Sequence, residues 1–486
     1  MLFNSYTFIF VFLPLALLGF HLIGAWSHQR LAIAWLVAMS LVFYSWWNPA
    51  YLALLLLSIL GNYALGLALT RHKKKLTLIA GIFANITVLG FFKYTNFFLH
   101  NLSTALSVDY QIAPLILPLA ISFFTFQQIA YLVDAYQGKA HEYGFLNYCL
   151  FVSFFPQLIA GPIVHHKELL PQFSSATLYR LKSFNLAVGL TIFSIGLFKK
   201  VVIADEMAIY ANPIFDAALT GQTISFIDGW GAAFAYTFQL YFDFSGYSDM
   251  AIGLARMFGI SLPVNFFSPY KACNIIEFWR RWHMTLSRFL RDYIYIPIGG
   301  NTRRVTSILF TMLLGGLWHG AGWTFILWGG LHGLYLLINH LWQTYTPPQP
   351  SCRTCWSGRV LTFILITLGW VLFRAQSWDA FIAMLLGMSG MNGYGLPINT
   401  PDINWKSVYG ILVGLTFIVW TMPNTSQLMS RYQPTLKHDL LPTTPIWKPL
   451  DQKWRYNSTG AYITAVISII GFSMLSRVSE FLYYQF

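Results

Sequence analysis

Three histidines lie in a stretch of the chain that contains no Asp, Glu, Lys or Arg. They are His319, His332 and His340, and the stretch lies between Arg304 and Arg353. An ionisable side chain at membrane depth is energetically costly, so its first interpretation is functional. Histidine is also the side chain that most often acts as a general base near neutral pH. We therefore expect proton transfer in this apolar stretch.

His319 is the first candidate catalytic residue. Several glycines surround it, and they allow a close approach of backbone or substrate and indicate a helix break; they are Gly315, Gly316, Gly320 and Gly322. A straight helix that enters the membrane after Arg304 would carry His319 roughly 22 Å inward, into a hydrocarbon core about 30 Å thick. A histidine there needs a polar partner or a wet cavity. The alternative is a histidine that only bonds neighbouring helices.

His332 is a second candidate catalytic residue, thirteen residues after His319. On one ideal helix the two side chains would point about 220° apart, although a break at Gly320–Gly322 would change that angle. A purely structural role for His332 is the competing interpretation.

Asp243 is the third candidate, in the apolar segment YFDFSGYSDM (Tyr241–Met250). A carboxylate beside an imidazole can orient the ring and stabilise its cation. Two alternatives stay open: an intramembrane ion pair, with Arg256 as a partner, or a helix cap at Ser245 or Ser248.

Residues 278–293 have helical periodicity, with aromatic and aliphatic side chains on one face and arginines on the other. The arginines of this segment are Arg280, Arg281, Arg288 and Arg291. The pattern predicts an amphipathic helix in the membrane interface. Its arginines either anchor the chain to anionic lipid head groups or hold the phosphates of an anionic substrate or of coenzyme A.

Composition identifies an integral membrane protein. The chain is 56% hydrophobic and 10% charged, whereas a soluble domain is about 25% charged. We predict an all-α, polytopic bundle over residues 1–486, with about 11–13 membrane helices, re-entrant and interfacial helices, and a central tunnel. The sequence gives the weakest indication of helices over residues 379–486.

The net charge of +13 comes from basic clusters in short loops beside apolar segments, which is typical of cytoplasmic loops and not of nucleic-acid binding. We expect Arg71–Lys75, Lys199–Lys200 and Arg280–Arg304 to face the cytoplasm. The long Ile224–Phe258 segment must then cross the membrane twice or re-enter.

No metal site is expected. Cys352 and Cys355 form a C-x-x-C pattern, but a metal needs further ligands, and a local disulfide remains open if their loop faces an oxidising compartment. The chain also has no P-loop, dinucleotide fingerprint or H-E-x-x-H motif.

Six segments in this order resemble the membrane-bound O-acyltransferase superfamily, and within it the bacterial branch that acts in alginate O-acetylation. They are ISFFTFQQIAYLVD (Ile121–Asp134), FFPQLIAGPI (Phe154–Ile163), YFDFSGYSDMAIGLARM (Tyr241–Met257), FWRRWHMTLSRFLRDYIYIPIGGN (Phe278–Asn301), LLGGLWHGAGWTFILWGGLHG (Leu313–Gly333) and GWVLFRA (Gly369–Ala375). The resemblance runs from Met1 nearly to Arg374.

This resemblance implies acyl transfer through the bacterial inner membrane, with His319 of the W-H-G-A motif as the catalytic residue. The implied donor is cytoplasmic acetyl-coenzyme A, used as a substrate rather than held permanently. The implied acceptor is a hydroxyl of an extracellular or periplasmic polysaccharide, reached with periplasmic or membrane-anchored partner proteins.

Two alternatives remain. One is D-alanyl transfer to teichoic acid from a carrier protein. The other is a transporter that moves acyl groups without covalent chemistry, in which Asp243, Asp249 and His319 form a proton relay.

Overall fold

The computed structural model describes residues 1–26, 28–107, 115–140, 144–346, 355–394, 403–436, 453–477 and 482. These residues form helices and loops, with no β-strand among them. The α-helices are α1 (Leu13–Ala25), α2 (Gln29–Ser45), α3 (Ala50–Arg71), α4 (Lys75–Leu106), α5 (Ile121–Tyr136), α6 (Phe145–Ser153), α7 (Phe155–Leu158), α8 (His166–Leu169), α9 (Ser183–Phe198), α10 (Asp205–Leu219), α11 (Phe226–Met257), α12 (Ile275–Trp279), α13 (Met284–Leu290), α14 (Arg304–His319), α15 (Trp323–Tyr345), α16 (Trp356–Arg374), α17 (Trp378–Met388), α18 (Trp405–Thr421), α19 (Thr425–Leu428) and α20 (Ser458–Ser473).

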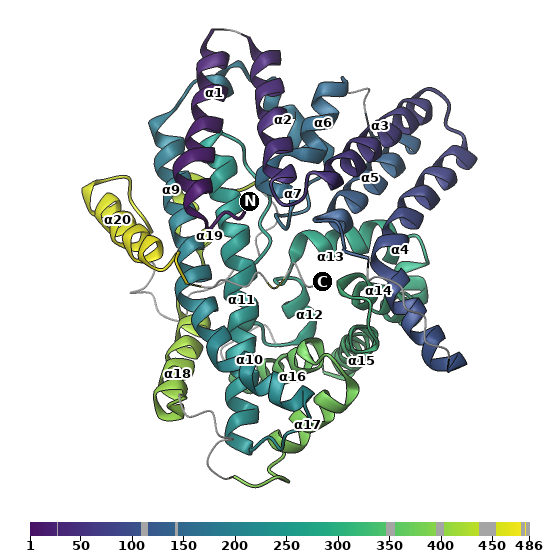
Figure 1. Cartoon of the computed structure of the whole chain (residues 1–486), viewed down its shortest axis with the longest axis vertical. Coiled ribbons are helices and arrows are strands. Elements are labelled where there is room, and N and C mark those ends of the chain that lie inside the picture. The colour runs from purple at the N-terminus through teal and green to yellow at the C-terminus, as the bar shows by residue number, and fades with distance from the viewer. Residues whose placement is uncertain are drawn as a thin grey trace.

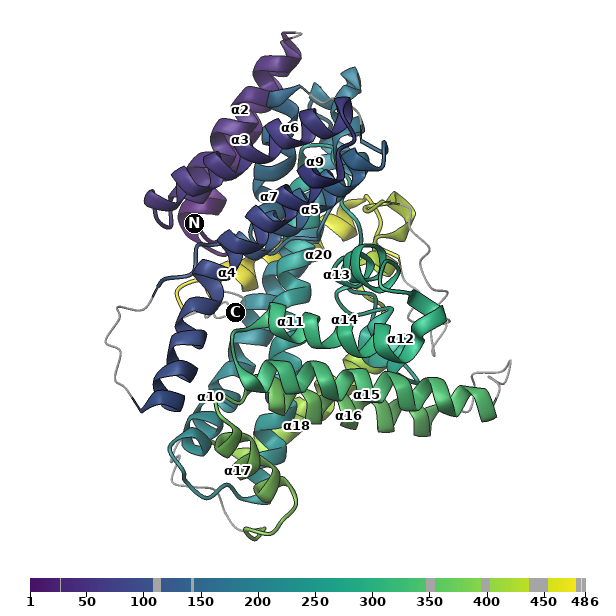
Figure 2. The same ribbon diagram turned by 90° about the vertical axis from the view of Figure 1, so that its right-hand side faces the viewer.

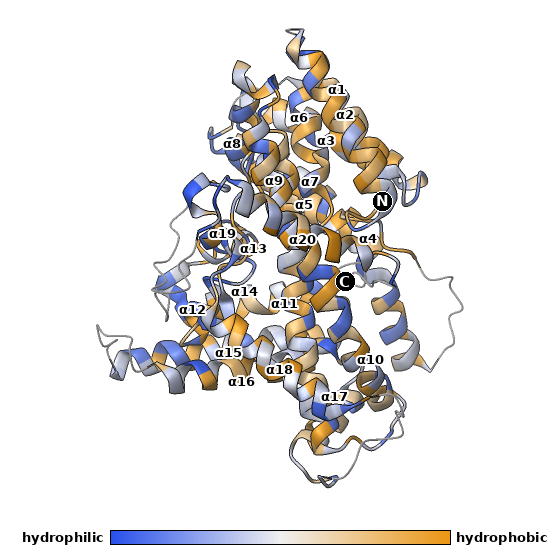
Figure 3. Cartoon of the chain, turned by 90° about the vertical axis from the view of Figure 1, so that its left-hand side faces the viewer, coloured by the Kyte–Doolittle hydropathy of each residue, from blue (hydrophilic) through white to orange (hydrophobic). Residues whose placement is uncertain are grey.

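Five described helical segments are long and apolar enough to cross a membrane: Phe8–Ala25, Ala50–Arg71, Lys75–Leu106, Ser183–Leu219 and Trp356–Arg374. Four shorter apolar helices, α2, α17, α18 and α20, accompany them. Large apolar side chains such as Leu22, Leu57 and Phe83 remain exposed on the outside of the bundle, where lipid would cover them. Figure 3 shows that helices α1–α3 are largely hydrophobic, whereas hydrophilic segments gather near α8 and α12. The predicted all-helical membrane fold is confirmed, and the predicted number of spans stays a prediction.

Helix α11 lies at the centre of the molecule, with α9 and α10 beside it (Figure 1). Close contact with α9 depends on paired glycines, because a Cβ added at Gly196 would lie 2.5 Å from the Gly246 carbonyl oxygen. The segment Ile224–Phe258 was predicted to cross twice or re-enter, which is wrong: α11 is one continuous helix of 32 residues. At 1.5 Å per residue it is about 48 Å long, and burial in protein rather than lipid permits that length.

Lys199 and Lys200 do not lie in a loop, although their basic character suggested one, and their predicted cytoplasmic side stays a prediction. Both lysines lie inside the uninterrupted helical segment Ser183–Leu219. Lys199 pairs with Asp249 at 2.6 Å, and Lys200 pairs with Asp205 at 2.8 Å. Burial of these lysines in the bundle is tolerated because a carboxylate of the next turn and carboxylates of α11 compensate their charge.

Helices α14 and α15 form a tight antiparallel hairpin around the turn at Gly320–Gly322. A Cβ added at Gly316 would overlap the Phe325 carbonyl oxygen, and one at Gly329 would overlap the Met312 carbonyl oxygen. The glycines therefore let the two backbones touch, as the sequence indicated. Figure 2 shows α15 side by side with α16, which forms the next layer.

The single amphipathic helix predicted over residues 278–293 is interrupted. Helix α12 ends at Trp279, His283 has a left-handed conformation with φ of 43°, and α13 begins at Met284. Asn265 holds this break, because its Oδ1 lies 3.1 Å from Nδ1 of His283 and accepts from the Thr285 hydroxyl at 2.9 Å.

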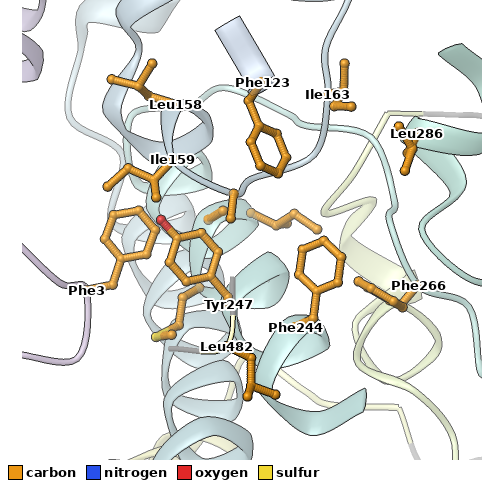
Figure 4. Close-up of a cluster of buried hydrophobic side chains, with 14 of the residues drawn as sticks. Phe3, Phe123, Leu158, Ile159, Ile163, Phe244, Tyr247, Phe266, Leu286 and Leu482 are labelled. Atoms are coloured by element: carbon orange, nitrogen blue, oxygen red, sulfur yellow. The ribbon is translucent and has the colours of Figure 1, made fainter. Parts of the chain in front are cut away.

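The apolar side of this segment faces protein and not lipid. Phe278, Trp282, Leu286 and Phe289 are each at most 3% exposed. Leu286 belongs to a buried cluster that joins α13 to Phe123 of α5 and to Phe244 of α11 (Figure 4). Lipid anchoring through this apolar face is therefore excluded by its packing.

The C-terminal helices pack on the same bundle. Helix α20 lies on α9, where the hydroxyls of Ser194 and Ser468 are 2.7 Å apart and those of Thr191 and Thr464 are 3.1 Å apart. Helix α18 contacts α11. A single domain over residues 1–486 stays a prediction, and Cys352 of the C-x-x-C pattern lies outside the described residues.

Candidate active site

A cavity of about 770 Å³ connects the arginine-rich segment with the end of α14. Its lining combines cationic and polar side chains with an apolar wall. The residues used below are Trp279, Arg280, Arg288, Arg291, Thr311, Gly315, His319, Trp328 and His340. This volume suits a small-molecule ligand of the size of a drug or cofactor. The sequence predicted a central tunnel. The structure has this cavity, and its continuation to the opposite face of the membrane stays a prediction.

His319 is the last residue of α14 and lies 6% exposed in the cavity wall. Rings from three directions fix its imidazole: the centroids of Trp318, Trp328 and Phe373 lie 4.9, 5.3 and 5.3 Å away. The sequence prediction of a histidine at a glycine-rich helix end beside a cavity matches this geometry. An imidazole in such a place can take a proton from a hydroxyl group that enters the cavity.

His332 lies one layer behind the cavity wall. It is fully buried on α15, and its ring contacts Trp328 at 4.8 Å and Trp279 at 5.3 Å. The hairpin thus brings His332 and His319 to the same indole of Trp328, which a single straight helix would not do. Among the described residues, neither ring nitrogen of His332 has a hydrogen-bond partner.

We expect His332→Ala to lower the rate by about 10-fold, because the loss of support for Trp328 would displace His319 only slightly. A steady-state assay on purified protein measures this effect. Gly369→Ala is a matched variant, since its added Cβ would lie 2.6 Å from Nε2 of His332 and would shift the ring without removing it. A well-folded but inactive His332→Ala protein would instead indicate a two-histidine site.

The four predicted cofactor-binding arginines separate into two groups. Arg280, Arg288 and Arg291 line the cavity. Arg281 does not; it is buried and pairs with Glu277, and its Nη1 lies 3.5 Å from the Phe267 carbonyl oxygen. Arg281 is therefore a structural residue of the α12–α13 break.

The three cavity arginines also differ in how strongly they are held. Glu168 binds Arg288 through two hydrogen bonds of 2.7 and 2.9 Å. Burial would raise the pKa of the Glu168 carboxyl, but the Arg288 guanidinium outweighs burial and holds that pKa below its ordinary value. Arg291 pairs with Asp292 at 2.7 Å. Arg280 forms no ion pair among the described residues, so its guanidinium is available to an anion.

Of the sequence interpretations of Asp243, contact with a histidine is not found among the described residues. Asp243 is 1% exposed on α11, and its Oδ1 lies 2.7 Å from Nζ of Lys200. Lys200 also pairs with Asp205. The alternative of an intramembrane ion pair is therefore correct, but its partner is Lys200 and not Arg256, because the turn after α9 faces the middle of α11.

Sequence reasoning missed Lys93, a buried lysine of α4 that contacts the Trp318 carbonyl oxygen. Lys93 lies in the middle of α4, which continues to Leu106. A signal was present, since Lys93 is the only Asp, Glu, Lys or Arg between Lys75 and Asp109. Across the part of the chain that the structure describes, no group of three or more His, Cys, Asp or Glu residues could hold a metal ion.

Comparisons with known proteins agree with the resemblance. Residues 41–377 match the sequence profile of the membrane-bound O-acyltransferase family. The chain is 48% identical over 430 residues to the peptidoglycan O-acetyltransferase of Helicobacter pylori, covering 82% of this chain and 81% of the relative. It is 38% identical over 510 residues to the probable alginate O-acetylase AlgI of Pseudomonas putida, covering 100% of both.

A more distant relative is the teichoic acid D-alanyltransferase of Bacillus subtilis. It is 30% identical over 275 residues, which cover 53% of this chain and 69% of the relative.

Proposed function

Because the chain belongs to the membrane-bound O-acyltransferase family, we propose that it moves an acetyl group from cytoplasmic acetyl-coenzyme A across the membrane for O-acetylation of an extracellular or periplasmic polysaccharide. The supporting observation is the cavity that has arginines at one part of its lining and His319 at another. Relatives that are named as alginate and peptidoglycan O-acetyltransferases favour a sugar hydroxyl as the acceptor.

In this proposal, His319 acts as the general base. It takes the proton of the acceptor hydroxyl while the hydroxyl oxygen forms a bond to the thioester carbonyl carbon. The carbon–sulfur bond then breaks, and the coenzyme A thiolate receives the proton from the imidazole. Burial of His319 among Trp318, Trp328 and Phe373 keeps bulk water from competing with the hydroxyl.

Arg280 is our principal candidate for the phosphates of coenzyme A. Guanidinium groups bind phosphate with two parallel hydrogen bonds, and Arg280 lines the cavity without an ion pair to another described residue. Arg291 would assist, because its side chain is 61% exposed and can exchange Asp292 for a phosphate. Arg288 would assist less, because the Glu168 carboxylate already accepts hydrogen bonds from both of its Nη atoms.

We expect Arg280→Ala to raise the KM for acetyl-coenzyme A by about 10-fold, since one charge-assisted contact contributes about 1.5–3 kcal/mol. The kcat should change little, because Arg280 would contact the phosphates and not the reacting carbonyl. The rate of coenzyme A thiol release at varied acetyl-coenzyme A concentration measures both constants.

Arg303→Ala is the matched control, because Arg303 is an exposed arginine of the same basic region that does not line the cavity. It should leave the donor KM unchanged. Equal effects of the two substitutions would mean that general positive charge attracts the donor, and would contradict a specific phosphate site at Arg280.

The proposed setting is the bacterial cytoplasmic (inner) membrane, with Arg71–Lys75 and Arg280–Arg304 towards the cytoplasm. Transfer to the polymer would involve periplasmic or membrane-anchored partner proteins. D-alanyl transfer to teichoic acid is less well supported, because the D-alanyltransferase of Bacillus subtilis matches about half of this chain. A non-covalent transporter is the remaining alternative.

A single experiment separates these functions. Purified protein in proteoliposomes is supplied with radiolabelled acetyl-coenzyme A and with alginate or peptidoglycan glycan fragments, with and without a periplasmic and membrane extract of the source bacterium that supplies the partner proteins. Label on a polysaccharide hydroxyl, together with stoichiometric release of coenzyme A thiol, supports the proposal. Free acetyl-coenzyme A crossing the membrane intact would favour transport, and reaction only with a D-alanyl carrier protein would favour the second candidate.

A further inference from the structure

Helix α4 is attached to the α14–α15 turn by three polar side chains, two at the end of α14 and one at the start of α15. The Lys93 ammonium donates to the Trp318 carbonyl oxygen, and the Tyr94 hydroxyl donates to the Leu317 carbonyl oxygen at 2.8 Å. On the other side of the glycine turn, the indole Nε1 of Trp323 donates to Asn101 at 2.9 Å. Helix α4 therefore holds both ends of the α14–α15 turn.

The two carbonyl groups belong to the last turn of α14, immediately before His319. The last carbonyls of an α-helix have no partner within the helix, and they form the negative end of its dipole. A cation and a hydroxyl from α4 satisfy two of them here. This arrangement fixes the backbone from which the His319 side chain projects.

The surroundings of the Lys93 ammonium offer few alternatives to its hydrogen bond with the Trp318 carbonyl oxygen. It is 8% exposed, and no Asp or Glu of the described residues forms an ion pair with it. Its Nζ lies 3.4 Å from the Ser122 hydroxyl and 5.6 Å from the centroid of the Trp318 ring. A buried lysine without a carboxylate is costly in a membrane, and packing alone would be better served by an apolar residue.

Trp318 transmits the position of α4 to His319. Its ring lies 5.5 Å from Phe123 and 5.3 Å from Phe126 of α5, and 4.9 Å from the His319 ring. The Lys93 ammonium holds the same residue through both its carbonyl group and its ring. A shift of Trp318 would therefore move His319 relative to the cavity.

We propose that Lys93 and Tyr94 are positioning residues, which hold the last turn of α14 so that His319 points into the cavity. This inference rests on the proposed role of His319 as the general base. Neither residue lines the cavity, so both act through the backbone of Trp318 and Leu317. Displacement of a reacting group by about 1 Å lowers rates by about 100-fold.

The test compares Lys93→Met, Lys93→Arg and Tyr94→Phe in the full-length protein in proteoliposomes. Lys93→Met should lower kcat by about 10- to 100-fold with the donor KM unchanged, because the catalytic group and not the donor site is displaced. Lys93→Arg keeps a cationic donor and should restore most of kcat. Tyr94→Phe should lower kcat by a few-fold.

Lys271→Met is the matched control. Lys271 also donates to carbonyls at a helix end, those of Thr421 and Met422 at 3.4 and 2.6 Å, but at α18 and away from the cavity. It should change stability without changing kcat. If the Lys93→Met protein does not accumulate, the Tyr94→Phe protein provides the test. A lowered kcat at unchanged donor KM then supports the proposal, and a wild-type kcat overturns it.

Hydrogen exchange at Leu314–Gly322 gives a readout that needs no activity. Faster exchange in Lys93→Met and Tyr94→Phe than in Lys271→Met supports positioning, and unchanged exchange overturns it. The two proposals fail in different ways. An active His319→Ala protein would refute the general base, whereas an inactive His319→Ala with a fully active Lys93→Met would refute only the positioning role.

Discussion

Replacement of His319 by Ala should lower acetyl transfer by about 10²–10⁴-fold, the range typical for the loss of a general base. The substitution removes the one imidazole that both ends α14 and lines the cavity among rings. The donor KM should stay near the wild-type value, because the arginines that would hold coenzyme A are unchanged. Initial rates of thiol release and of acetyl incorporation, measured in the same samples, give both quantities.

His319→Gln controls for volume and polarity, since Gln can donate and accept hydrogen bonds but cannot act as a base near neutral pH. Both variants should retain the wild-type fold, because the rings of Trp328 and Phe373, which pack against His319, also pack against each other with centroids 5.1 Å apart. Near-normal acetylation by either variant would contradict the role of His319 as the general base. Loss of folded protein in His319→Ala alone would make the glutamine variant the decisive one.

Lys200→Met should destabilise the folded protein by about 3–5 kcal/mol, because it leaves the carboxylates of Asp243 and Asp205 buried without their cation. All three side chains are at most 8% exposed. Thermal unfolding in detergent, followed by the monodisperse fraction, measures the loss. Asp243→Asn should be milder, since Lys200 keeps Asp205 as its partner.

The double variant Lys200→Met with Asp243→Asn tests the origin of this effect. Removing the second charge should recover part of the lost stability, and the coupling between the two substitutions reports the ion pair. A simple sum of the two single effects would contradict a direct pair.

The requirement for Asp243 in activity remains a prediction from the sequence, but the contact with Lys200 changes its physical reason. If Asp243→Asn unfolds at a lower temperature yet keeps its kcat per folded molecule, Asp243 supports the fold. If it is stable and has lost kcat, it contributes to the reaction by a route other than contact with a histidine.

The sequence predicted some local features well because a single segment carries them. The apolar stretch around His319 places an imidazole at membrane depth whatever the rest of the chain does, and the glycines at 315–322 predict a break wherever the helix lies. The amphipathic pattern over residues 278–293 was misleading for the same reason. Periodicity reports which side chains share a face, but Asn265 interrupts the helix from a separate loop.

The sequence by itself determined that this is a helical membrane protein of an acyltransferase family and that His319 is its leading candidate residue, because hydropathy and motifs are properties of contiguous residues. The tertiary structure decided which charges meet. Lys93 and Trp318 are 225 positions apart, and Arg288 and Glu168 are 120 apart. Such pairs depend on the rotation and depth of helices relative to one another, and in a low-dielectric interior each charge must find its partner at that distance. Packing therefore set the roles of Asp243, Lys200, Arg281 and Lys93.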